Sequence, residues 1–450
     1  MIKNLVDKKI KPIFTDKDSK NSLKNRLLKG AAGSFGLKIA ASGLAFAISI
    51  MFARFLGTTG LGTYAYATTW ANLLSIPATL GIDNLLVREV AVYQAKSRWG
   101  LLSGMLRWSN RVVLVTSIIL AAIAGTVAWG IKGSSDPAIA ISICLALITL
   151  PLAALRNLRL GAMKGLHRVV LGQMPEMLFS PLLMISLTTG LYFLLPQYFS
   201  VQGVLGIKIA IVAITFTIGA IWLTRSLPDG VKHTVPEYQT GQWIRSALPF
   251  MFLGTIQLIN SRIDIIMLGA IEGVKAVGIY AVIVGITQLV TFIHYSANSV
   301  LAPNIARLYA EERMEQLQRT IAKSVSLVFI VSGLISGILM ASSYWVLSIF
   351  GVEFTPGQTA MNILIVGQLF HSMTGPVGIL LDMTGHERYT AIAAGCSAVL
   401  NVLLNAFLIP KWGINGAAAA TTTSLIIVNV FNIFLVKKKL KISPTAWSIF

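Results

Sequence analysis

The stretch of sequence that decides the fold covers residues 53–91 and reads ARFLGTTGLGTYAYATTWANLLSIPATLGIDNLLVREVA. An apolar helix leads into Arg54, and a glycine-rich turn follows at residues 57–62. A second apolar helix is expected to start at Tyr64 and to end near Glu89. Glycine tolerates the positive backbone angles of a tight turn, so the pattern predicts two membrane helices joined by a short reversal.

Residues 262–309 repeat this pattern more loosely. Arg262 and Asp264 precede a Leu-Gly pair at residues 268–269, and a loop leads to the Gly278-Ile-Tyr280 start of another apolar helix. The chain therefore resembles two copies of one helix-turn-helix membrane unit. Each copy carries a few charges where the bilayer makes charge costly.

The composition supports a membrane protein with many spans. Of the 450 residues, 55% are hydrophobic and only 12% are charged, and the mean hydropathy is +0.74. A soluble domain has about 25% charged residues. The two cysteines, Cys144 and Cys396, lie in apolar runs, and no Cys/His cluster has metal-ligand spacing, so we expect neither a metal nor a disulfide framework.

Hydropathy and length predict an all-α polytopic membrane protein with about twelve transmembrane helices, because one span needs about 20 apolar residues. The expected spans lie near 30–55, 63–87, 108–131, 137–159, 169–195, 201–224, 243–268, 275–303, 321–349, 357–383, 388–409 and 414–436.

The net charge of +20 reflects topology rather than a nucleic-acid partner, because most cations fall in alternate loops and in the two tails. The segments expected inside contain the N-terminal tail, Lys96, Arg98, Arg107, Arg111, Arg156, Arg159, Lys164, Arg168, Arg225, Lys232, Arg245, Arg307, Arg313, Arg319, Lys323, Arg388, Lys437, Lys438, Lys439 and Lys441. Only Lys132, Lys275 and Lys411 fall in the expected outer turns, with Arg54 at a helix end. This asymmetry predicts the plasma (inner) membrane as the location, with both termini cytoplasmic.

The expected domains are a basic tail (1–29), a six-helix lobe (30–225), a polar linker (226–241), a second six-helix lobe (242–436) and a basic tail (437–450). Six is even, so both lobes enter from the same side, and the repeats are related by a pseudo-twofold axis along the membrane normal. Pro196 with Gly203 and Pro410 with Gly413 mark corresponding turns before the last helix of each lobe.

These stretches resemble the oligosaccharide-lipid flippase family, which exports O-antigen and other polysaccharide repeat units. That family belongs to the superfamily that includes multidrug and toxic-compound extruders and the lipid II flippase. The motifs that carry the resemblance are Ala53-Arg54-x-Leu56-Gly57, Gly62-x-Tyr64, Gly81-Ile-Asp83-x-x-Leu-Val-Arg88-Glu89, Arg262-x-Asp264-x-x-x-Leu268-Gly269, Gly278-x-Tyr280, Ala302-Pro303-x-x-Ala306-Arg307 and Asn401-x-x-Leu-Asn405-x-x-x-Ile409-Pro410. Family members often have fourteen spans, whereas this chain has twelve expected ones.

The resemblance implies two lobes in a V around a central, cation-lined cavity. A polyprenyl pyrophosphate carrying an oligosaccharide would enter it from the inner leaflet, and the lobes would rock to release the head group outside. Glycan polymerases or glycosyltransferases of the same pathway would be partners, together with membrane lipids. No cofactor is implied.

Three cations are candidates for binding an anionic head group inside the membrane. Lys38 lies in the first span, where it either snorkels to the interface or faces the cavity. Arg54 either anchors the outer end of that helix or closes the cavity there, as a gate or in a pair with an acid of the other lobe. Arg262 in the seventh span is expected to face the cavity, because a guanidinium binds phosphate with two parallel hydrogen bonds.

Arg88 and Arg307 are expected at the cytoplasmic mouth, where they would pair with neighbouring groups or steer anionic head groups. Asp83, Glu176 and Asp264 are candidates for coupling transport to H⁺ or Na⁺, or are structural ion-pair partners. His294 and His371 are weaker coupling candidates, since a lone histidine in an apolar helix is usually a hydrogen-bonded packing residue.

Three functions remain open at this point. The first is a lipid-linked oligosaccharide flippase, and the second is a cation-coupled exporter of drugs or other small molecules. The third, an enzyme such as a membrane glycosyltransferase, is disfavoured because the expected outer loops are short and no set of paired carboxylates or nucleophile with base stands out. We therefore expect no catalytic residues.

Overall fold

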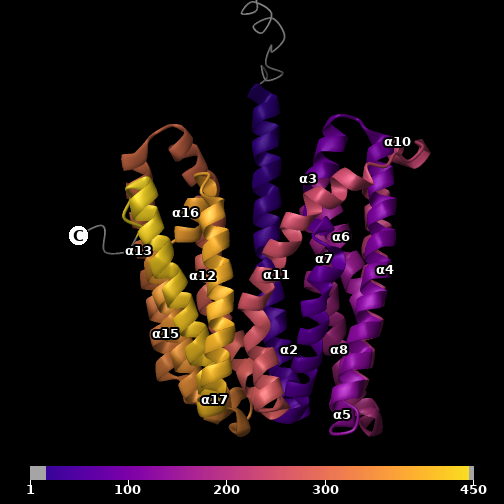
Figure 1. Ribbon diagram of the computed structural model, residues 1–450, viewed down its shortest axis with the longest axis vertical. Helices are drawn as coiled ribbons and strands as arrows, with labels where there is room; N and C mark the ends of the chain where they lie inside the picture. The colour runs from indigo at the N-terminus through magenta and orange to yellow at the C-terminus, as the bar shows by residue number, and fades with distance from the viewer. Residues whose placement is uncertain (1–16, 445–450) are drawn as a thin grey trace, which may run out of the picture.

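The computed structural model describes residues 17–444, and the remainder of both predicted tails, 1–16 and 445–450, lies outside the described residues. All regular elements in this part of the chain are helices (Figure 1). They are α2 (Lys17–Thr79), α3 (Ile82–Ala95), α4 (Trp99–Lys132), α5 (Pro137–Ile148), α6 (Leu150–Gly165), α7 (Val169–Met174), η1 (Pro175–Phe179), α8 (Ser180–Leu194), η2 (Pro196–Tyr198), α9 (Val201–Ser226), α10 (Asp229–His233), α11 (Thr240–Ile271), α12 (Val274–Ala310), α13 (Met314–Ala341), α14 (Ser343–Phe350), η3 (Val352–Gly357), α15 (Gln358–Thr374), α16 (Val377–Met383) and α17 (Glu387–Leu440).

Two of these helices are each two spans joined by a sharp reversal. α2 has 63 residues and non-helical backbone angles at Gly57 (φ 66°, ψ −175°), and α17 has 54 residues and a break at Gly413 (φ 52°, ψ −127°). At the helical rise, either would be roughly 80 Å or longer if straight, far more than the roughly 30 Å of a bilayer core. The sequence prediction of reversals at these two glycine-rich turns is confirmed.

The twelve-span prediction agrees with the observed helices. Within residues 17–444, nine helices are long and apolar enough to cross a membrane, and the bent pair Val352–Thr374 and Val377–Met383 makes a tenth span. Counting α2 and α17 as two limbs each gives twelve. These helices form the two six-helix lobes expected from the sequence.

Several predicted boundaries were wrong. The second span was expected to reach residue 87, but the second limb of α2 ends at Thr79, and positive φ angles at Leu80 (53°) and Gly81 (73°) turn the chain into α3. Asp83 therefore lies in the first turn of α3. The first helix begins at Lys17, ahead of the span expected near residues 30–55.

The two lobes form a V. α2 to α9 make up most of one lobe and α12 to α17 the other, with α11 between them (Figure 1). The lobes separate towards the upper end of Figure 1, where α2 begins, and meet at the lower end, where the first limb of α2 turns. At that lower end Gly62 of α2 packs on the backbone of Val274 and Gly278 at the start of α12.

The segment between the lobes is tied to the first lobe. The backbone N–H of Glu237 donates to the carbonyl oxygen of Gly100 at the start of α4 (2.9 Å). The indole N–H of Trp243, buried near the start of α11, donates to the hydroxyl of Tyr93 on α3 (2.9 Å). α11 is therefore anchored to the first lobe at its N-terminal end, although the chain continues from it into the second.

Candidate functional site

A cavity of about 960 Å³ lies between the first limb of α2 and the second lobe. The first lobe contributes only residues 39–49 of α2 to its wall, and all other lining residues belong to the segment 260–428. Its uncharged polar side chains are Ser42, Ser49, Asn260, Ser261, Tyr280, Thr287, Gln288, Thr291, Tyr295, Gln368, His371, Ser397, Asn401, Thr421 and Ser424. Apolar and aromatic groups, among them Phe46 and Phe292, fill the spaces between them. The wall therefore offers many neutral hydrogen-bonding groups around an apolar background.

The cavity is not lined by cations, which corrects the expectation drawn from the resemblance. Among the described residues that line it there is no lysine or arginine, and Asp264 is the one carboxylate. Asp264 is 7% exposed. It accepts hydrogen bonds from the hydroxyl of Tyr280 and from the backbone N–H of Ile265, both at 2.8 Å. Arg262 and Asp264 are two residues apart on α11 and point in different directions. The sequence alone could not show which of the two side chains lines the cavity.

Arg262 lies outside the cavity wall. Asn260, Ser261 and Asp264 of the same helix line the cavity, whereas Arg262 does not. Gly269 lies seven residues further along α11, which is close to two helical turns, so it is on the same face of the helix as Arg262. Gly269 packs on the ring of Tyr66. Arg262 thus lies on the side of α11 that carries Gly269, and it is not among the residues that line this cavity, contrary to what had been expected of it.

Lys38 is exposed and directly precedes Ile39, the first residue of α2 that lines the cavity. It is one helical turn from Ser42, a cavity residue, and therefore on the same face of α2. In the part of the chain that the structure describes, its ammonium group has no hydrogen bond or ion pair. This placement fits both alternatives left open from the sequence, a cation at the cavity mouth and a cation at the interface.

Arg54 bridges the two lobes at the lower end. Its guanidinium donates to the carbonyl oxygens of Ile349 (2.7 Å) and Ser348 (2.9 Å), in the last turn of α14. These carbonyls have no partner within their own helix and carry the negative end of the helix dipole, so they attract a cation. Arg54 thus joins the other lobe as one of the sequence alternatives supposed, although through backbone carbonyls and not through an acid.

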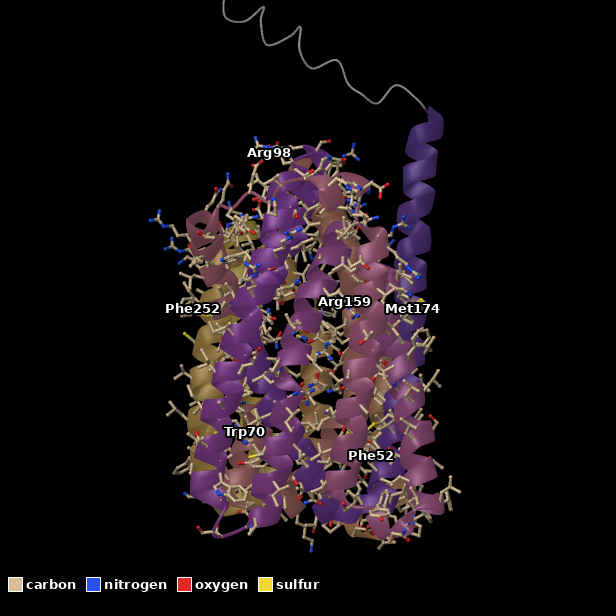
Figure 2. All side chains as sticks on the ribbon, turned by 90° about the vertical axis from the view of Figure 1, so that its right-hand side faces the viewer. Phe52, Trp70, Arg98, Arg159, Met174 and Phe252 are labelled. Atoms are coloured by element: carbon tan, nitrogen blue, oxygen red, sulfur yellow. The ribbon has the colours of Figure 1, made fainter. Side chains whose placement is uncertain are left out.

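A cluster of charged side chains lies inside the first lobe. Arg159 of α6 is 3% exposed and forms an ion pair with Glu176 in the π-helical turn η1, and it also donates to the carbonyl oxygen of Thr215 on α9 (3.3 Å). Figure 2 shows Arg159 at mid-height of the bundle, between Arg98 at the upper end and Phe52 near the lower end. Arg159 was counted among the cytoplasmic loop charges, and this was wrong.

Two further cations complete the cluster. Arg156 interacts electrostatically with Arg159 and Glu176, and Lys208 of α9 interacts with Arg156. The ammonium nitrogen of Lys208 lies 5.0 Å from the ring centroid of Tyr64. Three cations thus share one carboxylate. Among the described residues, Nε of Arg156, Nε of Arg159 and Oε2 of Glu176 are buried and have no hydrogen-bond partner.

The remaining predicted site residues lie near the upper end or in local pairs. Arg88 forms an ion pair with its neighbour Glu89 (2.8 Å). Asp83 accepts a hydrogen bond from the hydroxyl of Thr79 (3.3 Å). Arg307 is exposed in the last turn of α12. The structure therefore does not bring these residues into the central cavity.

Sequence reasoning missed most of the cavity wall and two members of the charged cluster. One signal was available: Arg156 and Arg159 follow Pro151 within an apolar run and are three residues apart, which puts both on one helix face. The neutral wall gave no such signal, because serine, threonine and asparagine are common in membrane helices for packing reasons.

Comparison with known proteins places the chain in a family. The sequence profile described as polysaccharide biosynthesis protein matches residues 27–309, and the profile MatE matches residues 249–407. A relative from Haloferax volcanii, named a probable low-salt glycan biosynthesis flippase, Agl15, is 22% identical over 409 residues, covering 90% of this chain and 82% of the relative.

Solved structures share the fold. An inward-facing multidrug resistance MATE family transporter of the MOP superfamily superposes with a TM-score of 0.74 at 15% identity, covering 90% of this chain and 94% of that one. The lipid II flippase MurJ in an inward closed conformation superposes with a TM-score of 0.65 at 14% identity, covering 91% and 87%.

Proposed function

The chain belongs to the polysaccharide biosynthesis protein family, and from this membership we propose that it carries a lipid-linked oligosaccharide across the membrane. It is a membrane transporter and not an enzyme. The proposed substrate is a polyprenyl pyrophosphate bearing an oligosaccharide or polysaccharide repeat unit. The proposed direction is from the cytoplasmic to the outer leaflet, by alternating access of the two lobes.

The observation that carries this proposal is the chemistry of the cavity wall. Sugars present many hydroxyl groups and apolar ring faces, so they are bound by neutral hydrogen-bonding side chains and aromatic rings. The wall offers amides such as Asn401 and Gln368, hydroxyls such as Thr421, and the rings of Phe46 and Tyr295. A volume of about 960 Å³ is at the upper end of ordinary ligand sites. A carrier of lipophilic cations would need mainly apolar and acidic groups.

The cluster in the first lobe supports the same proposal. A buried charge is stable only when it is paired or solvated, and Arg156, Arg159 and Lys208 have only Glu176 to balance them. An anionic group that approaches this lobe from the centre of the V would meet an attractive field. We propose that the pyrophosphate is attracted by these cations, while the sugars occupy the neutral cavity beside the second lobe.

The proposed orientation is supported by the distribution of charge. Figure 2 shows Arg98 at the upper end of the bundle, the end at which α2 begins. Arg307 and Lys437 lie in the last turns of α12 and α17, and Lys132 and Lys411 lie at the turn after α4 and just before the break at Gly413. With the basic end in the cytoplasm, the lobes separate towards the cytoplasm and are held together at the outer end by Arg54 and the glycine contact. This arrangement favours entry of the substrate from the inner leaflet, in a plasma membrane with both termini cytoplasmic.

A second candidate function is cation-coupled export of drugs or small molecules. Asp264 favours it, since a buried carboxylate on the cavity wall attracts a cation. The MatE profile match over residues 249–407 includes most of the second-lobe part of this wall. Coupling to H⁺ or Na⁺ through Asp83, Glu176 or Asp264 is compatible with transport of a lipid-linked oligosaccharide and with export of a drug or other small molecule. Glycan polymerases or glycosyltransferases are proposed as partners only under the first function, the glycolipid flippase.

A depletion experiment in the native cell tests the proposal. Loss of the protein should strand lipid-linked oligosaccharide on the cytoplasmic leaflet and reduce surface glycan, and the intact chain should restore both. The Arg156→Gln and Lys208→Gln variants should restore them poorly at equal expression. An unchanged glycolipid pool, with altered resistance to cationic dyes instead, would favour the second function and overturn the first.

A further inference from the structure

Two histidines of the second lobe are in ring-to-ring contact inside the helix bundle. His294 of α12 and His371 of α15 have ring centroids 4.2 Å apart, with the ring planes tilted by 47°. His294 is 4% exposed. The pair lies between two spaces, because His371 lines the main cavity and His294 lines a small neighbouring pocket. Residues 77 apart in the chain are thus in direct ring contact.

The hydrogen bonds around His371 fix the position of its proton. The side-chain amide of Asn429 donates through Nδ2 to the carbonyl oxygen of Leu425 (2.7 Å), so its Oδ1 faces His371. That Oδ1 lies 3.0 Å from Nδ1 of His371. An amide oxygen only accepts, so Nδ1 carries the hydrogen and Nε2 is the atom of the neutral ring that can take up another proton.

This network also contacts the break in the tenth span. α15 ends three residues after His371, at Thr374, and the chain then bends by 42° at Gly375 (φ 74°) before α16. The hydroxyl of Thr374 lies 2.8 Å from the carbonyl oxygen of His371 and 3.1 Å from Oδ1 of Asn429. A change at the imidazole is therefore transmitted directly to the last turn before the bend.

The surroundings of the pair are neutral. From α17 the contact is Asn429, from α13 the neighbouring pocket residues are Ser324, Val325 and Val328, and from α12 the adjacent ring is Tyr295. Asp264 and Tyr280 are the other titratable groups that line the cavity with His371 and Tyr295. Neither imidazole forms an ion pair within residues 17–444.

We propose that His294 and His371 together form a binding site for a single proton, and that proton binding and the present packing of α12 against α15 exclude each other. A charged imidazole needs water or a counter-ion, and the buried side of the pair at His294, which is 4% exposed and forms no ion pair among the described residues, offers neither. A ligand shifts a conformational equilibrium towards the state that binds it more tightly, and here the ligand is the proton. Acid therefore favours an arrangement in which the two rings separate and become solvated. This site would couple the binding of a proton to the rocking of the lobes. This coupling rests on the proposed transport function.

Inter-lobe distances test the site without any substrate. Spin labels at Arg98 and Arg313, two exposed positions near the upper ends of the two lobes, are placed in a background with Cys144 and Cys396 replaced by serine. On lowering the pH from about 8 to about 5, the proportion of molecules with widely separated labels should fall about threefold. The H294Q and H371Q variants should show no such response. H386Q, a histidine variant outside both the pair and the cavity wall, is the control and should keep the response.

A second measurement reads the proton directly. NMR selective for histidine side chains is recorded on the protein without spin labels, and the resonances of His294 and His371 are assigned with the same variants. The two resonances should titrate together, with the uptake of one proton. Independent titration of the two rings, no titration between about pH 8 and pH 5, or a pH response that survives in both variants would overturn the site. A protein that keeps this response but moves no glycolipid would contradict the proposed function alone.

Discussion

Gly62 and Gly278, which occupy matching places in the two sequence repeats, lie against each other where the lobes meet. A Cβ atom at Gly62 would lie 1.7 Å from the carbonyl oxygen of Val274, and one at Gly278 would lie 2.0 Å from the carbonyl oxygen of Thr58. Two backbones can approach this closely only where both side chains are hydrogen atoms. The two glycines that occupy matching places in the sequence repeats therefore also form a contact between the lobes.

Alanine at either glycine should weaken this contact. Gly62→Ala and Gly278→Ala should each destabilise the protein by about 1–3 kcal/mol, because the backbones must move apart. Thermal unfolding of the purified protein in detergent measures the effect. Gly337→Ala is the control, since no atom lies within 4 Å of its would-be Cβ, and it should leave the unfolding temperature unchanged or raise it.

Arg54 should act as a latch between the lobes at the lower end. Replacing it with glutamine removes the charged donor to Ile349 and Ser348, although exposure to solvent limits the loss to about 1 kcal/mol, or about a fivefold shift towards the form open at this end. Distances between labels on α2 and α14 measure the shift. An unchanged distance distribution would show that the two hydrogen bonds do not hold the lobes.

The ion pair inside the first lobe should be strongly non-additive. Glu176→Met leaves the buried guanidinium of Arg159 without its carboxylate and should cost about 3–5 kcal/mol, whereas adding Arg159→Met to this variant should cost clearly less than the sum of the two single losses. Unfolding temperatures of the single and double variants provide the test. Additive losses would mean that Arg156 and Lys208, and not Arg159, determine the charge balance around Glu176.

The sequence was sufficient to predict the arrangement of the spans but not the orientation of their side chains. Hydrophobic length and the loop cations predicted twelve spans, and the glycine-rich turns at Gly57 and Gly413 predicted both reversals. These features depend on local composition. Helix breaks inside apolar runs, such as the turn at Gly81, were placed less well, because apolar residues continue across them.

The candidate site was predicted least well. Arg262 was expected to face the cavity, yet Asp264 lines it and Arg262 does not, because packing determines which face of a helix is turned towards a cavity. Arg159 was assigned to a loop because it falls at the end of an apolar run, and only the tertiary structure shows that α6 continues beyond it to Gly165. The excess of cations in the chain therefore did not predict which residues line the cavity.

Filling the cavity should block transport and leave the fold intact. Gly43 of α2 lines the cavity and has no atom within 4 Å of a would-be Cβ, so Gly43→Phe should reduce glycolipid transport at least about tenfold with little change in unfolding temperature. Gly206→Phe is the matched control, since Gly206 is exposed and equally unobstructed but does not line the cavity. Equal loss in both variants would contradict a substrate site in this cavity.

Reconstitution tests the central claim most directly. Purified protein in vesicles is supplied with a short-chain polyprenyl pyrophosphate oligosaccharide bearing a fluorophore, and a membrane-impermeant quencher reports how much crosses the bilayer. The account predicts protein-dependent crossing that is weakened in R156Q and K208Q and abolished in G43F. Crossing of a cationic dye that requires Asp264, with no crossing of the glycolipid in the same vesicles, would contradict it.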